Sequence, residues 1–329
     1  MLSFLTNNNI PRDVWSSFVY GHPDGNVFQT PEMFDVYCKA SDVIPLALAV
    51  FQNDEINGVL LAAIMTNGGA LLKRFTARSI ITGGPLMDDD TVLQSLLQEY
   101  RKNLPNYVVY SEIRPVFDIQ SIAETLESQY FAREGHYNLL MDIHQEESHL
   151  WERMHRERRR NVAKAQKAGL VFREIDTEEE IHSAIKLIID TYHRKRVPMS
   201  YVKVLDKLKP ILGNHVRFFA AFLGDKMLSC MVRLCYKGLF YSWFNGSDES
   251  YLKLYPNDFL TWNVIRLAHN EGYETYDFGG GGKPGIPYGV RDYKLKYGCE
   301  MYDYGRFVCV HHPLIFKLGK TAINILKNK

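Results

Sequence analysis

The residues with the clearest chemical potential lie near the end of the sequence, where two closely spaced lysines follow a glycine run. The four glycines 279–282 come directly after residues 275–278, whose composition is typical of a strand. If residues 291–297 form another strand, Asp292, Lys294 and Lys296 share one of its faces. Two lysines on one face beside a conformationally permissive loop could stabilise a developing oxyanion. An ordinary solvated strand face would show the same alternation.

The glycine run also has the formal spacing of a dinucleotide-binding fingerprint, through Gly280, Gly282 and Gly285. That fingerprint requires a helix whose N-terminus receives the pyrophosphate. Pro284 and Pro287 prevent a regular helix from starting there. The phosphate-binding loop of nucleotide hydrolases is excluded as well, because an aspartate occupies the place of its first glycine. We therefore expect an active-site loop, with a simple tight connection as the alternative.

A second candidate is a strongly basic segment, residues 151–168, which contains seven basic and two acidic residues. We expect it to form one helix. Three- and four-residue spacing places its most regular cations on one face, where they could bind the phosphates of a polyanionic donor. The alternative is a solvated helix face. These cations are Arg156, Arg159, Arg160 and Lys164.

The remaining motifs and the composition exclude several classes of protein. The histidines and the five cysteines lack the spacing of a metal site, so we predict no bound metal and reduced, packed thiols. With 39 basic, 38 acidic and 46% hydrophobic residues, the chain is neither disordered nor a polybasic tail. Its apolar runs are strand-sized, and no secretory signal is visible. A cytoplasmic enzyme is expected.

Two successive series of elements must position these residues. Each series contains a helix, antiparallel strands, a second helix and a further strand, which predicts a duplicated α+β unit joined near residues 144–150. The first series comprises a helix that starts at Thr30-Pro-Glu32, strands 45–51 and 57–65 with a polar turn between them, strand 79–82, helix 90–103 and strand 107–113. The second comprises helix 177–195, strands 216–223, 226–236 and 239–244, helix 258–270 and strand 275–278.

Several motifs of the sequence, taken together, resemble those of a known family. The motifs Tyr276-Asp-Phe-Gly-Gly, Pro284-Gly, Tyr288-Gly and Tyr293-Lys-x-x-Tyr-Gly298 are similar to the end of the second domain in Fem-type (FemABX) aminoacyltransferases. Further matches occur in order along nearly the whole chain, at Phe28-Gln-Thr-Pro-Glu32, Gly83-Gly-Pro85, Arg159–Gly169 and Tyr255–Trp262. Those enzymes build peptidoglycan cross-bridges from aminoacyl-tRNA and share a tandem N-acetyltransferase (GNAT) fold.

The resemblance implies a division of the chain and a set of site residues. Residues 1–143, completed by 311–329, would form the first GNAT-like domain, and residues 144–310 the second, with mixed sheets flanked by helices. The family's catalytic lysine falls on Lys294 and its aromatic neighbour on Tyr293, with Asp277 and Asp292 as the nearest carboxylates for proton transfer or for orienting the lysine. Substrate-binding positions would be Lys39, Arg194, Arg196, Tyr201, Asn245, Gly280, Gly281, Tyr288, Arg291 and Lys296.

The function expected from these observations is N-acyl transfer. An amino acid or other acyl group would move from an activated donor, aminoacyl-tRNA by resemblance, to an amine of a cell-wall or envelope precursor, with no bound cofactor. An acyl-CoA-dependent transferase acting on an amino sugar or glycan is an alternative, although the Arg/Gln-x-x-Gly-x-Gly/Ala loop of ordinary N-acetyltransferases is missing. A ligand-binding protein that kept the fold without activity is a third reading.

The final segment, residues 313–329, is an expected helix with a broad apolar stripe through Leu314, Leu318, Thr321 and Ile325. It contains four lysines and no acidic residue. Such a helix could lie on an anionic membrane surface, which predicts peripheral contact with the inner membrane. The alternative, implied by the family fold, is that the stripe packs on the first domain.

Overall fold

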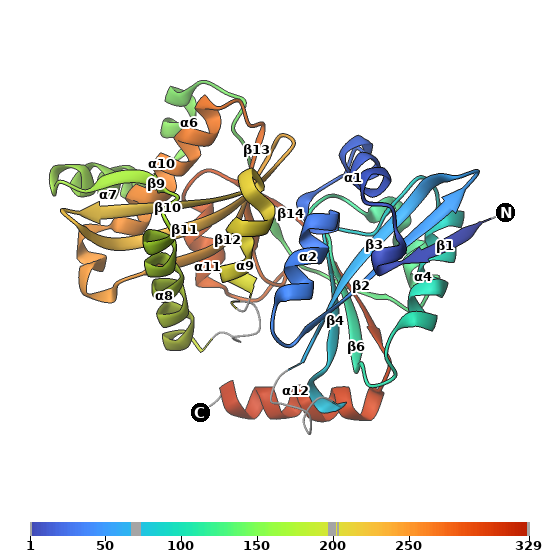
Figure 1. Cartoon of the computed structure of the whole chain (residues 1–329). Coiled ribbons are helices and arrows are strands. Elements are labelled where there is room, and N and C mark those ends of the chain that lie inside the picture. The colour runs from blue at the N-terminus through green and yellow to red at the C-terminus, as the bar shows by residue number, and fades with distance from the viewer. Residues whose placement is uncertain (1, 67–73, 197–201, 203, 328–329) are drawn as a thin grey trace. The chain divides into compact units, whose positions relative to one another are not determined.

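The computed structural model describes residues 2–66, 74–196, 202 and 204–327, with the side chains of 322–327 left out. The chain divides into two compact units (Figure 1). Unit 1 contains residues 1–135 and 304–329, and unit 2 contains residues 136–303. Each unit has its own sheet and its own hydrophobic core.

Unit 1 is built on a mixed sheet. Among its described residues, the strand order is β1-β2-β3-β4-β6-β15-β7, with the short β5 paired to β3. All neighbours are antiparallel except β4 and β6, which are parallel and are connected through helix α4. The strands are β1 (Ser3–Thr6), β2 (Val43–Gln52), β3 (Glu55–Met65), β4 (Arg78–Thr82), β5 (Leu86–Met87), β6 (Tyr110–Arg114), β7 (Ala132–Glu134) and β15 (Arg306–Val310). Its helices are α1 (Arg12–Gly21), α2 (Pro31–Lys39), α4 (Asp90–Asn103), α5 (Ala123–Ser128) and α12 (Pro313–Lys327).

Local sequence signals account for several of these elements. The expected hairpin between β2 and β3 is confirmed, and Asn53 and Asp54 both have positive φ in its two-residue turn, as a type I′ turn requires. The helix predicted over residues 90–103 is α4 itself. Its first turn is capped by Asp89, whose carboxylate accepts a hydrogen bond from the Val92 amide at 2.9 Å.

Unit 2 repeats this arrangement. Its described strands lie in the order β14-β8-β13-β12-β11-β10-β9, and only β12 and β13 run parallel, connected through helix α10. They are β8 (Asn138–Asp142), β9 (Val171–Ile175), β10 (Val216–Leu223), β11 (Lys226–Tyr236), β12 (Leu239–Ser247), β13 (Thr275–Gly280) and β14 (Glu300–Tyr302). The helices are α6 (Glu147–Arg153), α7 (Arg156–Lys167), α8 (Glu178–Arg194), α9 (Leu205–Leu212), α10 (Pro256–Asn270) and α11 (Gly289–Leu295).

The two units therefore share one plan, in which an antiparallel meander is followed by a helix and a parallel strand. This confirms the predicted α+β class with mixed sheets and flanking helices. α10 carries ten buried residues, because it crosses the sheet of unit 2 on its way from β12 to β13. In unit 1 the parallel strands β4 and β6 pair along their whole lengths, whereas in unit 2 the pairing of β12 with β13 covers only their first three residues.

The division between the units differs from the expected one. The structure places it at 135/136 and 303/304, whereas the sequence suggested 143/144 and 310/311. β8 belongs to unit 2 because it pairs with β13 and β14. β15 belongs to unit 1 because it inserts between β6 and β7. Strand pairing, rather than any local sequence signal, sets these boundaries.

The fold bears on two further expectations, one about the cysteines and one about membrane-spanning segments. All five cysteines are free, and four are buried while Cys38 is exposed. Within the described ranges, no helix combines the length and the apolar composition needed to span a bilayer.

Candidate active site

The candidate site lies in unit 2, where β12 and β13 separate. Their parallel pairing ends at Tyr241 and Asp277. Beyond this point β13 continues along β8 through an irregularity between Asp277 and Gly280. β12 also has an irregular register, with Trp243 left out of the pairing to β11. Bulges of this kind are frequent beside active sites because they redirect side chains and backbone groups.

Asp277 is completely buried at this separation point. One carboxylate oxygen, Oδ1, accepts a hydrogen bond of 2.6 Å from the Gly279 amide. The other, Oδ2, has no hydrogen-bond partner among the described residues. Burial raises the pKa of Asp277 to about 7, although the Gly279 amide and the charge of Lys294 oppose this shift. Gly279 itself has φ +74°, a conformation that favours glycine, so the amide contact depends on that residue type.

Lys294 is brought to the same place by α11. Its ammonium group donates to the Gly280 carbonyl at 2.9 Å. A Cβ atom on Gly279 would lie 3.4 Å from the Ser242 carbonyl oxygen, 3.7 Å from the Tyr241 hydroxyl and 4.0 Å from Lys294 Nζ, so these polar groups converge on one point. Burial lowers the pKa of Lys294 to about 8, while the neighbouring Asp277 charge raises it. Two oppositely charged groups that lie close together and both have perturbed pKa values are typical of functional sites.

The segment that carries Lys294 is a helix, so the expected strand over residues 291–297 is wrong. In a helix, residues two apart point in different directions, and Lys294 and Lys296 are separated accordingly. Lys296 forms an ion pair with Glu157 of α7, at 2.6 Å. Asp292 is exposed and has no hydrogen bond or ion pair to Lys294 among the described residues. Of the two carboxylates expected near the lysine, the structure brings only Asp277 to it.

Tyr293 points into a buried polar cluster rather than toward the separated strands. Its hydroxyl donates to Asp258 at 2.9 Å, and Tyr297, one turn later, donates to the same oxygen at 2.9 Å. Asp258 also accepts two 2.8 Å hydrogen bonds from Arg158 and one of 2.7 Å from Asn161. The Asp258 carboxylate therefore joins α7, α10 and α11. We refer to these residues, Arg158, Asn161, Asp258, Tyr293 and Tyr297, as the Asp258 cluster.

The glycine loop between β13 and α11 is held by Arg291 and by close packing. The Arg291 guanidinium donates to the carbonyls of Gly281, Lys283 and Ile286 at 3.3, 3.1 and 2.7 Å. A Cβ on Gly280 would approach His136 to 2.8 Å, and one on Gly282 would approach Tyr288 to 2.9 Å. The structure thus brings the predicted residues Gly280, Gly281, Tyr288, Arg291 and Lys294 together around this loop. Arg291 stabilises the loop's shape.

Two other predicted residues lie near the end of β12. The Asn245 side chain accepts a hydrogen bond of 3.1 Å from Arg233, a fully buried cation that also donates to the Tyr276 hydroxyl at 2.9 Å. Arg194, at the end of α8, donates to the Ser247 carbonyl at 2.7 Å and pairs with Glu249 at 3.2 Å. Both side chains therefore adjoin the strand that diverges from β13.

Of the remaining substrate-binding predictions, those in the described part of unit 2 do not join the residues around the glycine loop, and Lys39 belongs to unit 1. Lys39 is exposed at the end of α2 in unit 1. Arg196 is exposed just after α8, with φ +53°. Tyr201 lies outside the described residues. Lys296, as noted, is engaged with Glu157.

The basic segment is not one helix over residues 151–168, as expected, but two. α6 ends at Arg153, Met154 is buried, and the His155 side chain caps α7 by accepting a hydrogen bond of 3.3 Å from the Glu157 amide. On α7, the predicted cations Arg156, Arg160 and Lys164 are exposed and Arg159 is half-buried. These four residues form what we call the α7 basic face.

The sequence did not point to Asp258, Arg158 or Arg233. Asp258 follows Pro256 and Asn257 and reads as an ordinary residue of a helix's first turn. Arg158 is one arginine among several, and Arg233 lies inside an apolar strand. A charged residue within a strand whose neighbours are all apolar was the available signal that Arg233 is a buried cation.

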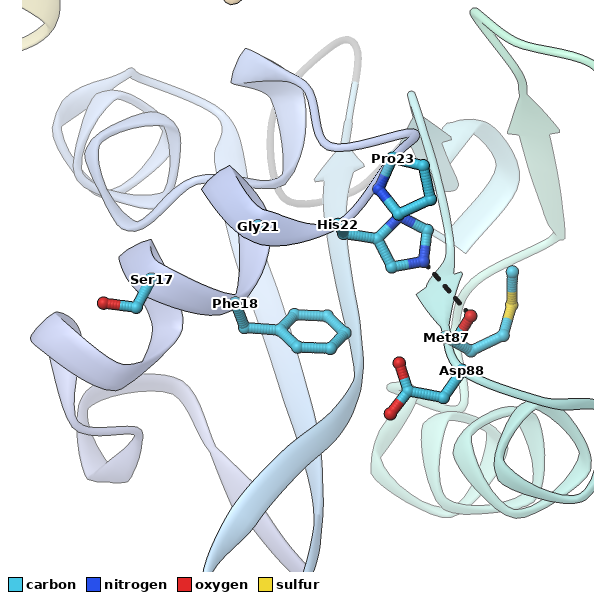
Figure 2. Close-up of a pocket in the computed structure, with 7 residues that line it drawn as sticks. All are labelled: Ser17, Phe18, Gly21, His22, Pro23, Met87 and Asp88. Atoms are coloured by element: carbon cyan, nitrogen blue, oxygen red, sulfur yellow. Dashed lines mark hydrogen bonds between the residues drawn. The ribbon is translucent and has the colours of Figure 1, made fainter.

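Unit 1 contains a separate pocket of about 440 Å³ beside the C-terminal end of α1 (Figure 2). The Phe18 ring and the Asp88 carboxylate point toward this space, whereas Ser17 points away. His22 Nδ1 accepts a hydrogen bond from the Asp24 amide, so Nε2 carries the proton and donates to the Met87 carbonyl at 3.1 Å. None of the predicted site residues lines this pocket. Across the described residues, no group of three or more His, Cys, Asp or Glu side chains could hold a metal ion.

Comparison with known families gives one match. Residues 152–295 match the model of the acetyltransferase (GNAT) domain, and this range contains α7, the separated strands and Lys294. A search of curated protein sequences found no significant match.

Solved structures with the same fold cover nearly the whole chain. FemX is 15% identical with a TM-score of 0.73, and the match covers 95% of this chain and 99% of FemX. A tandem GNAT protein from the clavulanic acid biosynthesis pathway is 10% identical with a TM-score of 0.58, over 94% and 99% of the two chains. A C-terminal domain from Agrobacterium fabrum, named for a lysylphosphatidylglycerol synthetase, is 10% identical with a TM-score of 0.58, over 94% and 95%. The predicted tandem GNAT-like fold and its resemblance to Fem-type proteins are confirmed.

Proposed function

From the premise that the chain is a tandem GNAT-type acyltransferase, we propose that it transfers an aminoacyl group from aminoacyl-tRNA to an amine of a cell-wall or envelope precursor. The observation that carries this proposal is the position of Lys294, whose half-buried ammonium group converges with backbone polar groups where β12 and β13 separate. The reaction needs no resident cofactor, because the donor is a co-substrate. It also implies a cytoplasmic location, where aminoacyl-tRNA is made.

The proposed step is direct attack of the acceptor amine on the acyl carbon. The nitrogen–carbon bond forms, the carbonyl electrons move onto oxygen, and the resulting oxyanion is stabilised by the Lys294 ammonium and by amides of the glycine loop. When the carbonyl re-forms, the carbon–oxygen bond to the ribose breaks. The proton lost by the amine is taken up by the departing ribose oxygen, so that no enzyme-bound intermediate is required.

Asp277 is assigned a positioning role in this proposal. Its side chain is wholly covered, so it does not touch the substrate, but its charge raises the pKa of Lys294. An ionised Asp277 therefore keeps Lys294 protonated and able to stabilise an oxyanion. The Gly279 amide fixes the carboxylate in the orientation that supports this.

Two kinds of support favour the choice of donor and acceptor. The α7 basic face offers exposed cations to the phosphates of a nucleic acid. FemX and a domain named for a lysylphosphatidylglycerol synthetase share the fold, and the second name describes aminoacylation of a lipid. A second candidate donor is acyl-CoA, with an amino sugar or glycan as acceptor, because the matched family model is one of acetyltransferases.

The experiment that separates these donors offers the purified full chain a pool of aminoacyl-tRNAs or a pool of acyl-CoAs, each with envelope precursors, and detects the consumed donor by mass spectrometry. We expect consumption of one aminoacyl-tRNA and appearance of an amide-linked product. Consumption of acyl-CoA alone would replace the first proposal with the second. Turnover of neither pool would contradict both.

A matched pair of variants tests the role of Lys294. Lys294→Ala is expected to lower turnover by roughly 100-fold or more while the protein stays folded, as loss of one oxyanion-stabilising group typically does. Lys296→Ala, two residues away, removes a lysine engaged with Glu157 and is expected to retain activity within a few-fold. Equal activity of the two variants would show that Lys294 takes no part in the mechanism.

A further inference from the structure

The outer face of α12 carries the two most exposed large aliphatic side chains among the described residues of the protein. Leu314 is 80% exposed and Leu318 is 70% exposed. They are four residues apart, so they lie beside each other on the helix surface. Water-exposed leucines in adjacent positions are costly, and together they indicate a surface that meets an apolar partner.

The rest of this helix separates into an inner and an outer side. Lys317 and Thr321 fall at the third and seventh positions after Leu314 and are exposed as well. The inner side contains Phe316, whose ring contacts Tyr110 of β6 edge-on at 5.2 Å. The expectation that the whole stripe packs on unit 1 is therefore wrong for its two leucines. We call Leu314, Lys317, Leu318 and Thr321 the outer face of α12, and the helix itself is labelled in Figure 1.

The charge on this segment is entirely positive. Residues 313–329 contain four lysines and no acidic residue. Lys317 lies between the two exposed leucines in the sequence and is itself exposed. Lys320 sits over the Phe316 ring at 4.5 Å and lies 3.6 Å from Glu134, so part of its charge is satisfied within unit 1.

We propose that the outer face of α12 binds an anionic bilayer surface, with Leu314 and Leu318 inserted at the interface and Lys317 beside the lipid phosphates. Exposed aliphatic residues next to the exposed Lys317 match both components of such a surface, its apolar boundary and its negative charge. A second copy of this chain fits less well. Two leucines are far short of the roughly 800 Å² per partner of a stable interface, and the facing lysines would repel each other.

This inference is independent of the acyl-transfer chemistry, because binding to vesicles is measured without turnover. Membrane binding would matter for the proposed function because of where it holds the enzyme. An acceptor amine carried by a lipid would be concentrated where the enzyme is held. A failure of vesicle binding would leave the donor experiment unaffected, and the reverse also holds.

The test is co-sedimentation of the full chain with vesicles of phosphatidylcholine alone or with added phosphatidylglycerol, at low and high salt. We expect binding to the anionic vesicles only, weakening as salt rises. The double variant Leu314→Ser/Leu318→Ser should bind at least about tenfold more weakly, since both inserted side chains are removed. The matched control is Val171→Ser/Leu252→Ser, which removes two exposed aliphatic residues of unit 2 and should bind like the original protein.

Three outcomes would overturn the proposal. The first is equal sedimentation with neutral and anionic vesicles. The second is unchanged binding by the Leu314→Ser/Leu318→Ser variant, with its folding verified by circular dichroism. The third is concentration-dependent dimerisation in light scattering that the same variant abolishes, in the absence of vesicle binding, which would assign the face to a second copy.

Discussion

Lys294 and Asp277 occupy a site that disfavours both of their charges. Burial lowers the pKa of the lysine and raises that of the aspartate. The charge of Lys294 is supported by Asp277, and the charge of Asp277 is supported by the Gly279 amide and then by Lys294. Such a pair is poorly suited to stabilising the fold, since both ionised groups are removed from water. Its arrangement is better explained by a requirement for a cation at the end of β13.

The pair leads to a prediction for the pH dependence of catalysis. The pKa of Asp277 is about 7 and that of Lys294 is about 8, so the ionised carboxylate is lost as pH falls through 7 and the ammonium is lost as pH rises through 8. Lys294 is protonated below pH 7 whether or not Asp277 is ionised, so we expect kcat/KM to be retained there and to fall as pH rises through about 8. The measurement is initial rate against pH with one acceptor amine. A flat profile from pH 6 to 9 would contradict it.

Asp277→Asn should alter that profile in a defined way. The alkaline limb should move to lower pH, because the carboxylate charge that raises the pKa of Lys294 has gone. We expect kcat to fall by about 10- to 100-fold at pH 7.5, within the range expected when electrostatic support is removed. If the alkaline limb stays where it was, Asp277 does not act through Lys294.

The sequence pointed to Lys294 because this residue falls in a motif that resembles one of a known family, whereas its spacing alone was equally open to a solvated strand face. It did not point to Asp258. The importance of that carboxylate comes from four side chains, on α7 and at α11, that reach it across 35 to 100 positions of sequence. Hydrogen bonds of this kind leave no trace in local spacing.

At the scale of elements, α11 is fixed in place by the Asp258 cluster. Tyr293 and Tyr297 lie one helical turn apart, so both hydroxyls reach Asp258, while Lys294 points toward the glycine loop. The alternating pattern of residues 291–297 favoured a strand, but these long-range hydrogen bonds determine the conformation. By contrast, α4 and α8 begin where the sequence predicted, because Asp89 and Thr177 provide local caps.

Removing the cation of the Asp258 cluster should destabilise unit 2. In Arg158→Met the Asp258 carboxylate stays buried without its charged partner, and we expect the free energy of unfolding to fall by about 3 to 5 kcal/mol. Urea denaturation measures the change. The control is Arg156→Met on the same helix, an exposed position where we expect a change within about 0.5 kcal/mol. A similar small change in both variants would mean that the buried pair contributes nothing net.

The glycine loop offers a second matched pair. In Gly280→Ala the new Cβ would meet His136 at 2.8 Å, so the ring or the loop must move and the Gly280 carbonyl would shift relative to Lys294. We expect kcat/KM to fall about tenfold, a typical cost of misplaced catalytic groups. In Gly289→Ala the Cβ meets nothing within 4 Å, and activity should be unchanged. Full activity of Gly280→Ala would show that the loop tolerates displacement.

At the scale of the whole molecule, the α7 basic face makes the donor proposal measurable through salt. If tRNA binds there, log affinity should fall linearly with log salt concentration. The triple variant Arg156→Ser/Arg160→Ser/Lys164→Ser should reduce the slope by up to about 0.9 for each phosphate that the protein no longer neutralises, and less for single-stranded RNA. A charge-matched triple serine variant at Lys102, Lys186 and Lys226 serves as the control. Identical salt slopes in the two variants would indicate that the α7 basic face is an ordinary solvated helix face that does not bind tRNA.

The overall architecture was predictable because duplicated series of elements are visible in the sequence, whereas the exact division of the chain was not. β8 and β15 have no feature that reveals which sheet they join. Only the pairing of β8 with β13, and of β15 with β6 and β7, decides it.

The position of β15 has a consequence for how the protein is made. Unit 2 is one continuous stretch of chain, so it can fold as soon as residues 136–303 have left the ribosome. Unit 1, although it begins first, lacks the strand between β6 and β7 until residues 306–310 emerge. Until then β6 presents an unpaired edge to other nascent chains. The earlier half of this protein is therefore completed last, and its open edge is the point at which chaperone protection during synthesis is most needed.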